Sequence, residues 1–360
     1  MESTQVRKHY IDNIRWTTVV LVIVYHIIYM YNSNGIITNL AEPGIPEMDF
    51  FAALVYPWFM VLLFVVAGMS ARYSLEKRSS KEFAKDRTFK LLIPSVAIIF
   101  IFGWVNGWIT DLEVDMFAAA PVKIPFIIKY IIYCISGIGP LWFAQELYLG
   151  SMLFLLLRKI DKKDKLYQLG GKVNIIVLII MALAVWISSF LFNTPVIEVY
   201  RNGIYLFTFF LGYYVFSHEK VTDKLVKWKW LLFGLAVVAG VGYGLLFYGE
   251  NYTTRFCLQH IVTNLYCWFA VLAIIGCFKA WLNKTNKFAT YMTKANYAFY
   301  VLHYTVMLVY AYLWVRNTEF PLIWHYIVPL LATFITLPLL YELIRRIPVL
   351  RFLILGISKR

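Results

Sequence analysis

Long apolar runs alternate with short polar segments along the whole chain. Most runs are close to the roughly 20 residues that an α-helix needs to cross about 30 Å of hydrocarbon. The pattern therefore predicts an all-α fold, a polytopic membrane helix bundle of about ten transmembrane helices. The predicted spans cover residues 14–33, 50–71, 91–110, 140–157, 173–192, 201–217, 230–248, 257–279, 296–315 and 322–344. A shorter apolar stretch, residues 124–135, is predicted to be interfacial or re-entrant.

Composition excludes an ordinary soluble fold. Hydrophobic residues make up 61% of the 360 residues and charged residues 15%, whereas soluble domains average roughly 45–50% and about 25%. No connection between the spans is long enough for a soluble domain, so residues 1–360 are predicted to form a single integral membrane domain. The first apolar run lacks an A-x-A cleavage site and is predicted to be a retained span rather than a signal peptide.

Charge predicts the orientation. The chain has 34 Lys and Arg residues against 20 Asp and Glu residues, and the basic residues lie in short blocks between the spans. A cytoplasmic N-terminus puts 29 of them inside and five outside, as the positive-inside rule requires. Both termini are then cytoplasmic, in a multi-pass protein of the cytoplasmic membrane. The five outside residues are Lys123, Lys129, Arg201, Arg255 and Arg316.

Two other classes of partner are not predicted. No nucleic-acid-binding motif accompanies the positive charge, so nucleic acid is not expected. The four cysteines contain no C-x-x-C pattern and no disulfide framework, and no metal site is predicted. The lipid bilayer is the partner that the composition does require.

Ionisable side chains inside the first span are functional candidates, because burying them in lipid costs at least a few kcal/mol. Arg15 lies at the predicted cytoplasmic edge, and His26 lies eleven residues further on, about 16 Å deeper and within about 20° of the same helix face. Asp12 can pair with Arg15. Histidine can accept a proton near neutral pH, and arginine can hold phosphate. The alternative for His26 is a neutral histidine that is hydrogen-bonded inside the bundle.

Two further spans carry polar faces. Trp142 and Glu146 lie at i,i+4 near the start of the 140–157 span, where Glu146 either orients an acceptor or a histidine, or satisfies a buried donor. Trp142 alone is typical of an interfacial belt. Asn296, Tyr300 and His303 share one face of the 296–315 span. Interhelical hydrogen bonding is the alternative to a direct role for His303.

Basic residues near span ends suggest binding of anions. Arg72, Arg87 and Lys90 stand at the two helix mouths around the 72–90 connection, where a phosphate-bearing cofactor could enter from the cytoplasm. Contact with lipid headgroups is the alternative. Arg201 and Arg255 lie at the starts of spans on the predicted outer side, against the prevailing charge bias, which suggests a role in substrate binding.

Five motifs together resemble the acyltransferase 3 family of membrane acyltransferases. The sequence Y-I-D-N-I-R-W followed by Y-H, with ten residues between Arg15 and His26, is similar to the signature of that family's first helix. Four further stretches agree in order, and the resemblance spans the whole chain. They are W-F-M-V-L-L-F-V-V-A-G-M-S-A-R-Y-S-L at 58–75, R-T-F-K-L-L-I-P at 87–94, L-W-F-A-Q-E-L at 141–147 and N-Y-A-F-Y-V-L-H at 296–303.

The resemblance implies transfer of an acyl group, usually acetyl, from cytoplasmic acyl-CoA to a hydroxyl of an extracytoplasmic or lipid-linked carbohydrate. It implies that Arg15 and His26 are essential, with His26 as general base and Glu146 beside the reacting groups. The residues then expected to bind the acetyl-CoA donor are Arg15, Arg72, Arg87 and Lys90. The residues expected to bind the glycan or glycolipid acceptor are Trp142, His303, Arg201 and Arg255.

The chain departs from the family pattern in two places. The common Leu-Arg-Gly of the first motif is Ile14, Arg15 and Trp16 here, so close packing at that glycine is not carried over. No C-terminal SGNH-type hydrolase domain is predicted, so the single-domain branch of the family, which modifies polysaccharides, is expected to be the better guide. Neither the identity of the acceptor, nor the acyl chain length, nor the oligomeric state follows from the resemblance.

A proton-coupled secondary transporter or exporter of a glycan or small acid is the main alternative, with His26 and Glu146 as coupling groups. Transporters commonly contain helices that are broken at the midplane, whereas residues 14–31 contain no Gly or Pro. This observation favours the enzyme. A non-catalytic sensor derived from an acyltransferase is a third possibility, against which the intact Arg15 and His26 argue.

Overall fold

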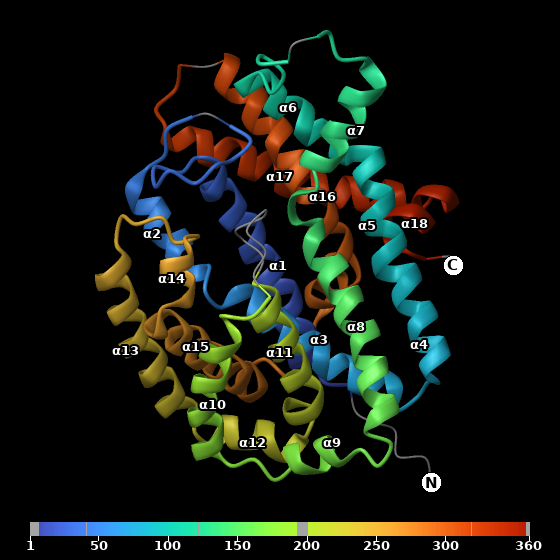
Figure 1. Ribbon diagram of the computed structural model, residues 1–360, viewed down its shortest axis with the longest axis vertical. Helices are drawn as coiled ribbons and strands as arrows, with labels where there is room; N and C mark the ends of the chain where they lie inside the picture. The colour runs from blue at the N-terminus through green and yellow to red at the C-terminus, as the bar shows by residue number, and fades with distance from the viewer. Residues whose placement is uncertain (1–6, 41, 121, 193–200, 318, 358–360) are drawn as a thin grey trace. The chain divides into compact units, whose positions relative to one another are not determined.

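The computed structural model describes residues 7–40, 42–120, 122–192, 201–317 and 319–357. These residues form helices and contain no β-strand, which confirms the predicted all-α class (Figure 1). Within them, eight helical segments are long and apolar enough to cross a membrane. These segments are His9–Met30, Pro46–Leu75, Ser80–Val114, Gly139–Ile160, Lys229–Phe247, Ile261–Trp281, Lys287–Arg316 and Ile323–Ile344.

The other two predicted spans correspond to shorter apolar helices. The predicted 173–192 span contains α10 (Ile175–Ser188), and the 201–217 span contains α11 (Asn202–Leu211), which continues as the π-helix Gly212–Phe216. The 124–135 stretch forms a short helix, α7 (Phe126–Ser136). The total of ten spans and the cytoplasmic location of both termini therefore stay predictions.

The helices group into two compact units. Of the described residues, the first unit comprises 7–18, 53–80, 152–192 and 201–294, and the second comprises 19–40, 42–52, 81–120, 122–151, 295–317 and 319–357. Five helices contribute residues to both units. They are α1 (His9–Met30), α2 (Pro46–Val55), α4 (Ser80–Arg87), α8 (Trp142–Ile160) and α16 (Lys287–Asn317).

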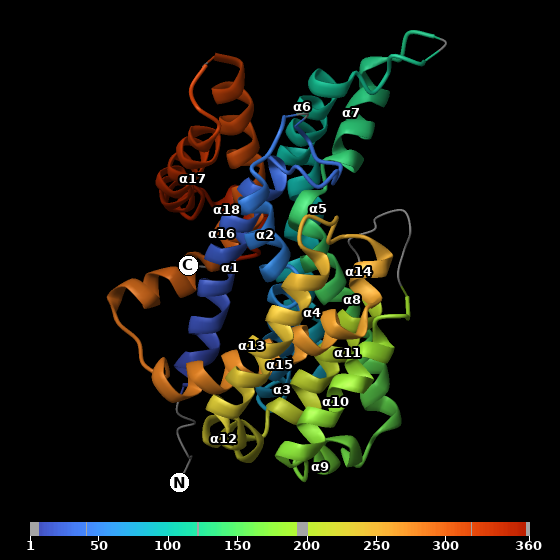
Figure 2. The same cartoon turned by 90° about the vertical axis from the view of Figure 1, so that its left-hand side faces the viewer.

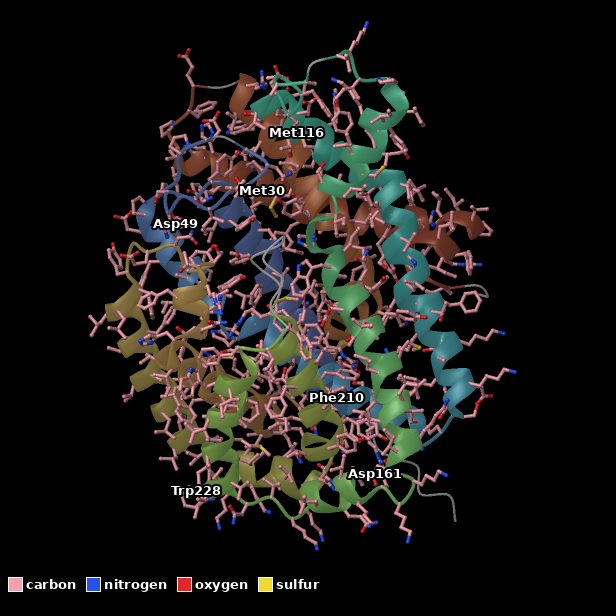
Figure 3. All side chains as sticks on the ribbon, viewed as in Figure 1. Met30, Asp49, Met116, Asp161, Phe210 and Trp228 are labelled. Atoms are coloured by element: carbon pink, nitrogen blue, oxygen red, sulfur yellow. The ribbon has the colours of Figure 1, made fainter. Side chains whose placement is uncertain are left out.

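In the first unit, α15 packs against α10, α12 and α13, and α3 packs against α11 (Figures 1 and 2). Glycines allow α3 and α11 to touch, because a Cβ on Gly68 would lie 2.0 Å from the carbonyl oxygen of Phe209. Trp228, which follows α12 directly, is exposed (Figure 3), as is common for an indole at a membrane interface. The remaining helices of this unit are α3 (Phe59–Leu75), α9 (Lys165–Gly170), α12 (Glu219–Lys227), α13 (Lys229–Phe247), α14 (Arg255–Gln259) and α15 (Ile261–Trp281).

The chain is interrupted between α2 and α3, around Pro57. Backbone carbonyls that are freed in an apolar interior require other donors. Arg201 Nη1 donates to the carbonyl oxygen of Pro57 at 3.1 Å, and Tyr266 Oη donates to that of Leu54 at 2.9 Å. Arg201 Nη2 also donates to Asn264 Oδ1 at 3.0 Å. Side chains from α15 and the start of α11 thus stabilise the break.

In the second unit, α6 lies beside α7 and α5 beside α18 (Figures 1 and 2). Asn106 on α6 donates to the carbonyl oxygen of Gly137 at 3.0 Å, which joins α6 to the end of α7. Gly356, with a φ of +65°, ends α18 against the backbone of Phe89. The remaining helices here are π-helix Thr88–Leu92, α5 (Ile93–Ile98), π-helix Ile99–Gly103, α6 (Trp104–Val114), α7, 3₁₀-helix Gly139–Leu141, α17 (Ile323–Ile344) and α18 (Pro348–Leu355).

Candidate active site

Two histidines, one from α1 and one from α16, meet in the second unit. His303 Nε2 lies 3.1 Å from His26 Nδ1, and the ring centroids are 5.0 Å apart. Each ring also forms a hydrogen bond with the backbone of its own helix. His303 Nδ1 lies 2.7 Å from the carbonyl oxygen of Tyr300. His26 Nδ1 lies 2.8 Å from the carbonyl oxygen of Val22. His303 is completely buried. The structure thus joins two candidates that are 277 residues apart in the sequence.

The carbonyl contacts assign the ring protons of this histidine pair. A carbonyl oxygen only accepts, so His303 Nδ1 carries the proton and, in the neutral ring, its Nε2 is an acceptor. His26 Nδ1 then donates to Val22 and to His303, which leaves the lone pair of neutral His26 on Nε2. Among the described residues, none forms a hydrogen bond with that Nε2. The network therefore presents His26 Nε2 as a proton acceptor.

Tyr300 connects the histidine-bearing helix to the start of α8, because its hydroxyl accepts a hydrogen bond from the backbone N–H of Ala144 at 3.2 Å. Trp142 is the first residue of α8, and Glu146 lies one turn later. Glu146 Oε1 and Asn296 Oδ1 are buried and lack a hydrogen-bond partner within the described chain. A buried polar atom without a partner is costly, so both positions are suited to a bound ligand.

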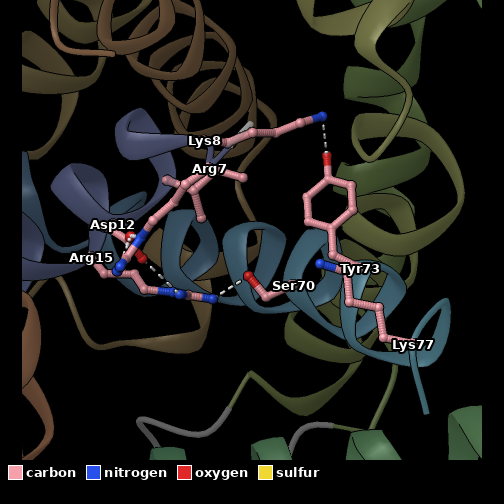
Figure 4. Close-up of a pocket in the computed structure, with 8 residues that line it drawn as sticks. Arg7, Lys8, Asp12, Arg15, Ser70, Tyr73 and Lys77 are labelled. Carbon is pink, nitrogen blue, oxygen red and sulfur yellow. Dashed lines mark hydrogen bonds and ion pairs between the residues drawn. The ribbon is translucent and has the colours of Figure 1, made fainter. Parts of the chain in front are cut away.

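Arg15 lines a pocket of about 400 Å³ in the first unit (Figure 4). Its guanidinium donates to Ser70 Oγ on α3, and its Nη1 lies 3.4 Å from Asp12 Oδ1. Side chains from the start of α1 and the two residues before it face side chains from the end of α3 and the turn after it across this pocket. The residues that line it are Arg7, Lys8, Ile11, Asp12, Arg15, Ser70, Tyr73 and Lys77.

The pocket carries an excess of positive charge, because Arg7, Lys8, Arg15 and Lys77 face a single carboxylate of the lining, Asp12. The side-chain ammonium of Lys77 has no hydrogen-bond or ion-pair partner among the described residues. Such a cluster of donors suits a phosphate or another multiply charged anion.

Glu219, which does not line the pocket, holds Lys8 in place. Lys8 Nζ donates to Glu219 and, at 3.0 Å, to Tyr73 Oη. Partial burial raises the pKa of the Glu219 carboxyl, but hydrogen bonds from Lys279 and Lys8 outweigh that effect, so the pKa lies below its usual value. Glu219 is therefore ionised near neutral pH and fixes the side chain of Lys8.

Arg72 belongs to the same unit but does not line the pocket. It forms ion pairs with Asp164 at 2.6 Å and Glu76 at 3.1 Å, and its guanidinium stacks on Tyr167 at 3.5 Å from the ring centroid. Most of its donors are thus engaged within the protein. Its predicted contact with the cofactor stays a prediction.

The other two predicted cofactor-binding residues lie in the second unit. Arg87 ends α4, and its guanidinium lies 4.8 Å from the ring centroid of Phe83. Lys90 lies in the following π-helix and pairs with Asp86 at 2.7 Å. Their predicted roles are likewise untested. Within the parts of the chain that are described, no three His, Cys, Asp or Glu side chains gather to hold a metal ion.

The two arginines of the first unit that are predicted to lie on the outer side have different surroundings. Arg201 is only 2% exposed, and its Nη atoms are occupied by Pro57 and Asn264. Arg255 lines a second pocket of about 360 Å³ together with Phe256, Gln259 and His260.

Comparison with known proteins decides the family. A family model described as an acyltransferase domain, Acyl_transf_3, matches residues 8–342, which is nearly the whole chain. The chain belongs to the acyltransferase 3 family. No curated protein and no solved structure matches the chain. Membership of the acyltransferase 3 family, together with eight apolar helices of membrane-spanning length among the described residues, makes this protein a membrane acyltransferase.

Several pocket residues of this acyltransferase 3 protein are not among the candidates that the sequence motifs indicate. Lys8 belongs to no motif and adds only to the positive charge, although Lys8, Asp12 and Arg15 repeat at i, i+4 and i+7. The second group, on α3 and the turn that follows it, repeats at i, i+3 and i+7 and comprises Ser70, Tyr73 and Lys77. Both spacings place side chains on one helix face. This periodicity is a signal from which each group of lining residues could be predicted. It does not indicate that the two groups face each other across a pocket.

Proposed function

We propose that this acyltransferase transfers an acetyl group from cytoplasmic acetyl-CoA to a hydroxyl of an extracytoplasmic or lipid-linked carbohydrate, in the cell membrane. The observation that carries the proposal is the histidine pair, in which His303 orients His26 so that its Nε2 can accept a proton. The membership of the family supports acyl transfer in general. The acetyl group, the donor and the acceptor are the proposed part.

The cationic pocket around Arg15 supports an acyl-CoA donor. CoA is a phosphate-bearing carrier whose thioester activates the acyl group. Arg15 and Lys77 would bind its phosphates, because guanidinium and ammonium groups form strong charge-assisted hydrogen bonds with phosphate oxygens. On the predicted topology this pocket faces the cytoplasm, where acyl-CoA is made.

Arg15 and His26 lie on the same helix, α1. It is continuous from His9 to Met30, so Arg15 and His26 lie about 16 Å apart along its axis, with side chains within about 20° of each other. The thioester of an acyl-CoA lies at the far end of the pantetheine arm from its phosphates. Phosphates bound at Arg15 therefore leave the acyl group free to extend along α1 towards His26.

His26 would act as the general base. Its Nε2 accepts the proton of the acceptor hydroxyl while that oxygen bonds to the acyl carbon and the bond from acyl carbon to sulfur breaks. His26 then returns the proton to the departing sulfur, which leaves as a thiol. His303 is a positioning residue, because it acts through His26 and fixes the tautomer of that ring.

The roles proposed for the remaining predicted residues rest on the chemistry of their side chains. The unpartnered Oε1 of Glu146 is suited to accept a hydrogen bond from the acceptor hydroxyl or from a histidine. Trp142 offers the acceptor an aromatic surface at the start of α8. Arg72, Arg87 and Lys90 are proposed to contribute to donor binding, as are Arg201 and Arg255 to acceptor binding.

Transfer of labelled acetyl tests the proposal. Acetyl-CoA carrying the label is supplied to the cytoplasmic face of sealed vesicles that contain the chain and cell-envelope glycans. Label in carbohydrate that requires intact His26 is the expected result. Absence of such label with acetyl and with longer acyl donors, in membranes known to contain an acceptor, contradicts the proposal.

A transporter is the second candidate, and the interruption around Pro57 is the observation that favours it, since broken helices are common in transporters. The carbonyls freed there are bonded by Arg201 and Tyr266, so they are engaged within the protein. The same vesicles separate the two functions: a transporter moves a glycan or acid across the membrane in the absence of acyl-CoA.

Replacing His303 tests its positioning role. We expect His303→Ala to lower kcat by about 10–100-fold, because general-base catalysis is worth about 10²–10⁴-fold and depends on the tautomer of His26. The KM for acetyl-CoA should stay unchanged. His303→Gln keeps a side-chain oxygen that can accept from His26 Nδ1 and should restore part of kcat. Equal kcat values for the two variants, or a change confined to KM, would contradict the role of His303.

Replacing Lys77 tests the donor pocket. Lys77→Gln should raise the KM for acetyl-CoA by about 2–5-fold at low salt, because an exposed cation interacts with phosphate by less than about 1 kcal/mol. The effect should fade as salt is added. Lys162→Gln, which alters a lysine outside the pocket, is the matched control. An unchanged KM for Lys77→Gln at low salt would remove Lys77 from donor binding.

A further inference from the structure

A second pocket, of about 360 Å³, lies in the first unit, at α14 and the start of α15. Arg255, Phe256, Gln259 and His260 line it. On the predicted topology these residues face the extracytoplasmic side, where a cationic side chain runs against the charge bias of the chain. The proton transfer proposed above does not involve this pocket, and the proposed contribution of Arg255 to acceptor binding does not say which class of acceptor the pocket fits.

Only some of the hydrogen-bond donors of the Arg255 guanidinium are used by the described residues. Its Nε donates to Gln259 Oε1 at 3.0 Å, while its two Nη atoms have no hydrogen-bond or ion-pair partner among the described residues. Arg201 provides the contrast, because its Nη atoms are bonded to Pro57 and Asn264. Arg255 therefore keeps its forked pair of donors for a ligand.

His260 adds a further donor to this pocket. The backbone N–H of Val262 donates to His260 Nδ1 at 3.3 Å, where His260 caps the N-terminus of α15. Because Nδ1 accepts this bond, the proton of the neutral ring is on Nε2. No described residue forms a hydrogen bond with that Nε2. Within the part of the chain that the structure describes, the polar groups of Arg255 and His260 that lack a partner are thus hydrogen-bond donors, which match an anionic ligand.

The other two lining residues narrow the ligand class. Phe256 is 74% exposed, so its ring offers an apolar face beside the donors. Gln259 uses Oε1 to accept from Arg255 and Nε2 to donate to the carbonyl oxygen of Ser189 at 3.3 Å, so it orients Arg255. An aromatic face beside a forked cation fits a ring-shaped ligand that carries a carboxylate or phosphate.

We infer that this pocket binds an acidic carbohydrate, that is, a sugar bearing a carboxylate or a phosphate, with Arg255 and His260 on the acidic group and Phe256 against the sugar ring. The inference rests on the proposed function, in which a carbohydrate accepts the acyl group, and it assigns that acceptor to the acidic class. Carboxylate and phosphate share the required chemistry, and separate probes distinguish them.

Binding to the full chain in phosphatidylcholine nanodiscs tests the inference, with dissociation constants measured by calorimetry in the absence of acyl-CoA. The probes are trigalacturonate, its neutral counterpart galactotriose, and mannose phosphate beside mannose. At least one acidic probe should bind at least tenfold more tightly than its neutral partner, because hydrogen bonds to charged groups are worth about that factor or more. Whichever acidic probe binds identifies the acidic group.

Variants locate the binding. Arg255→Gln should weaken the acidic probe about tenfold and abolish the preference over the neutral sugar, and Phe256→Leu should weaken acidic and neutral sugars alike. Arg316→Gln is the matched control, since Arg316 is also predicted to be outside but is already paired with Glu113 at 3.0 Å. Equal affinity for acidic and neutral sugars, or an Arg255→Gln variant with wild-type affinity, overturns the inference. Displacement of the probe by phosphatidylglycerol in the nanodisc overturns it in favour of a lipid headgroup.

The experiments distinguish failure of the proposed acyltransferase function from failure of the proposed acidic-carbohydrate pocket. If labelled acetyl reaches carbohydrate at the same rate in wild type and Arg255→Gln, the acyltransferase function is supported and the proposal that the pocket binds the acceptor is contradicted. Arg255-dependent binding of the acidic probe without acyl transfer to any carbohydrate would keep the pocket and remove the proposed function.

Discussion

Replacing His26 by alanine is expected to lower the rate of acyl transfer by about 10²–10⁴-fold, which is the usual contribution of a positioned general base. His26 presents an unprotonated Nε2 because its Nδ1 donates to Val22 and His303. Alanine removes the proton acceptor and leaves only a small cavity beside His303. The measurement is the initial rate of transfer of labelled acetyl into carbohydrate at saturating acetyl-CoA, with protein amounts matched in the membrane.

His9→Gln is the matched control for His26→Ala, because His9 lies on the same helix and outside both the histidine pair and the cationic pocket. This control should transfer acetyl at the wild-type rate. The affinity of His26→Ala for acetyl-CoA should equal that of wild type, which separates loss of the base from loss of the donor site. Product formed by His26→Ala at the wild-type rate would show that another group accepts the proton.

Replacing Arg15 by alanine is expected to raise the KM for acetyl-CoA about 10–100-fold, because charge-assisted hydrogen bonds contribute about 1.5–3 kcal/mol. Arg15 donates to Ser70 and lies near Asp12 in a pocket with an excess of cations, so its loss removes a central donor from that cluster. The measurement is the dependence of the initial rate on acetyl-CoA concentration at fixed salt. Transfer should recover in large part at high donor concentration.

Two variants sharpen the test of Arg15. Arg15→Lys keeps the charge but loses the forked geometry, so its KM should fall between those of wild type and Arg15→Ala. Arg346→Ala is the control, because Arg346 is 71% exposed and its nearest carboxylate oxygen lies 4.0 Å away. A wild-type dependence on acetyl-CoA in Arg15→Ala would exclude Arg15 from donor binding, and the cationic pocket would then need another ligand.

The membrane architecture was largely predictable from the sequence. Apolar runs identified all eight helices that are long enough to cross a membrane among the described residues. The predicted 173–192 span, which extends beyond α10 (Ile175–Ser188), shows why helix boundaries are harder to predict than helices. Apolar residues continue beyond the end of α10 in Phe190 and Leu191, so hydropathy does not mark where helical hydrogen bonding stops.

The candidate site was predictable only in part. The common face of Arg15 and His26 follows from helical periodicity along one continuous helix. The contact between His26 and His303 depends on how α1 packs against α16, and no spacing within either helix contains that information. The same limit applies to the cationic pocket, whose two faces come from α1 and α3.

Arg201 and Arg255 show this limit most clearly, because the same sequence argument applied to both. Arg201 is buried and donates to a carbonyl freed at the break around Pro57, whereas the Nη atoms of Arg255 have no partner among the described residues and line a pocket. By itself the sequence determined the membrane class, the apolar helices, the family signature and the face shared by Arg15 and His26. These properties depend on the free energy of transferring apolar side chains to lipid and on helical periodicity, and both are set by residues that are close together in the sequence. Only the tertiary structure decided which polar groups are paired and which stay free, because hydrogen-bond partners are set by packing between residues far apart in sequence.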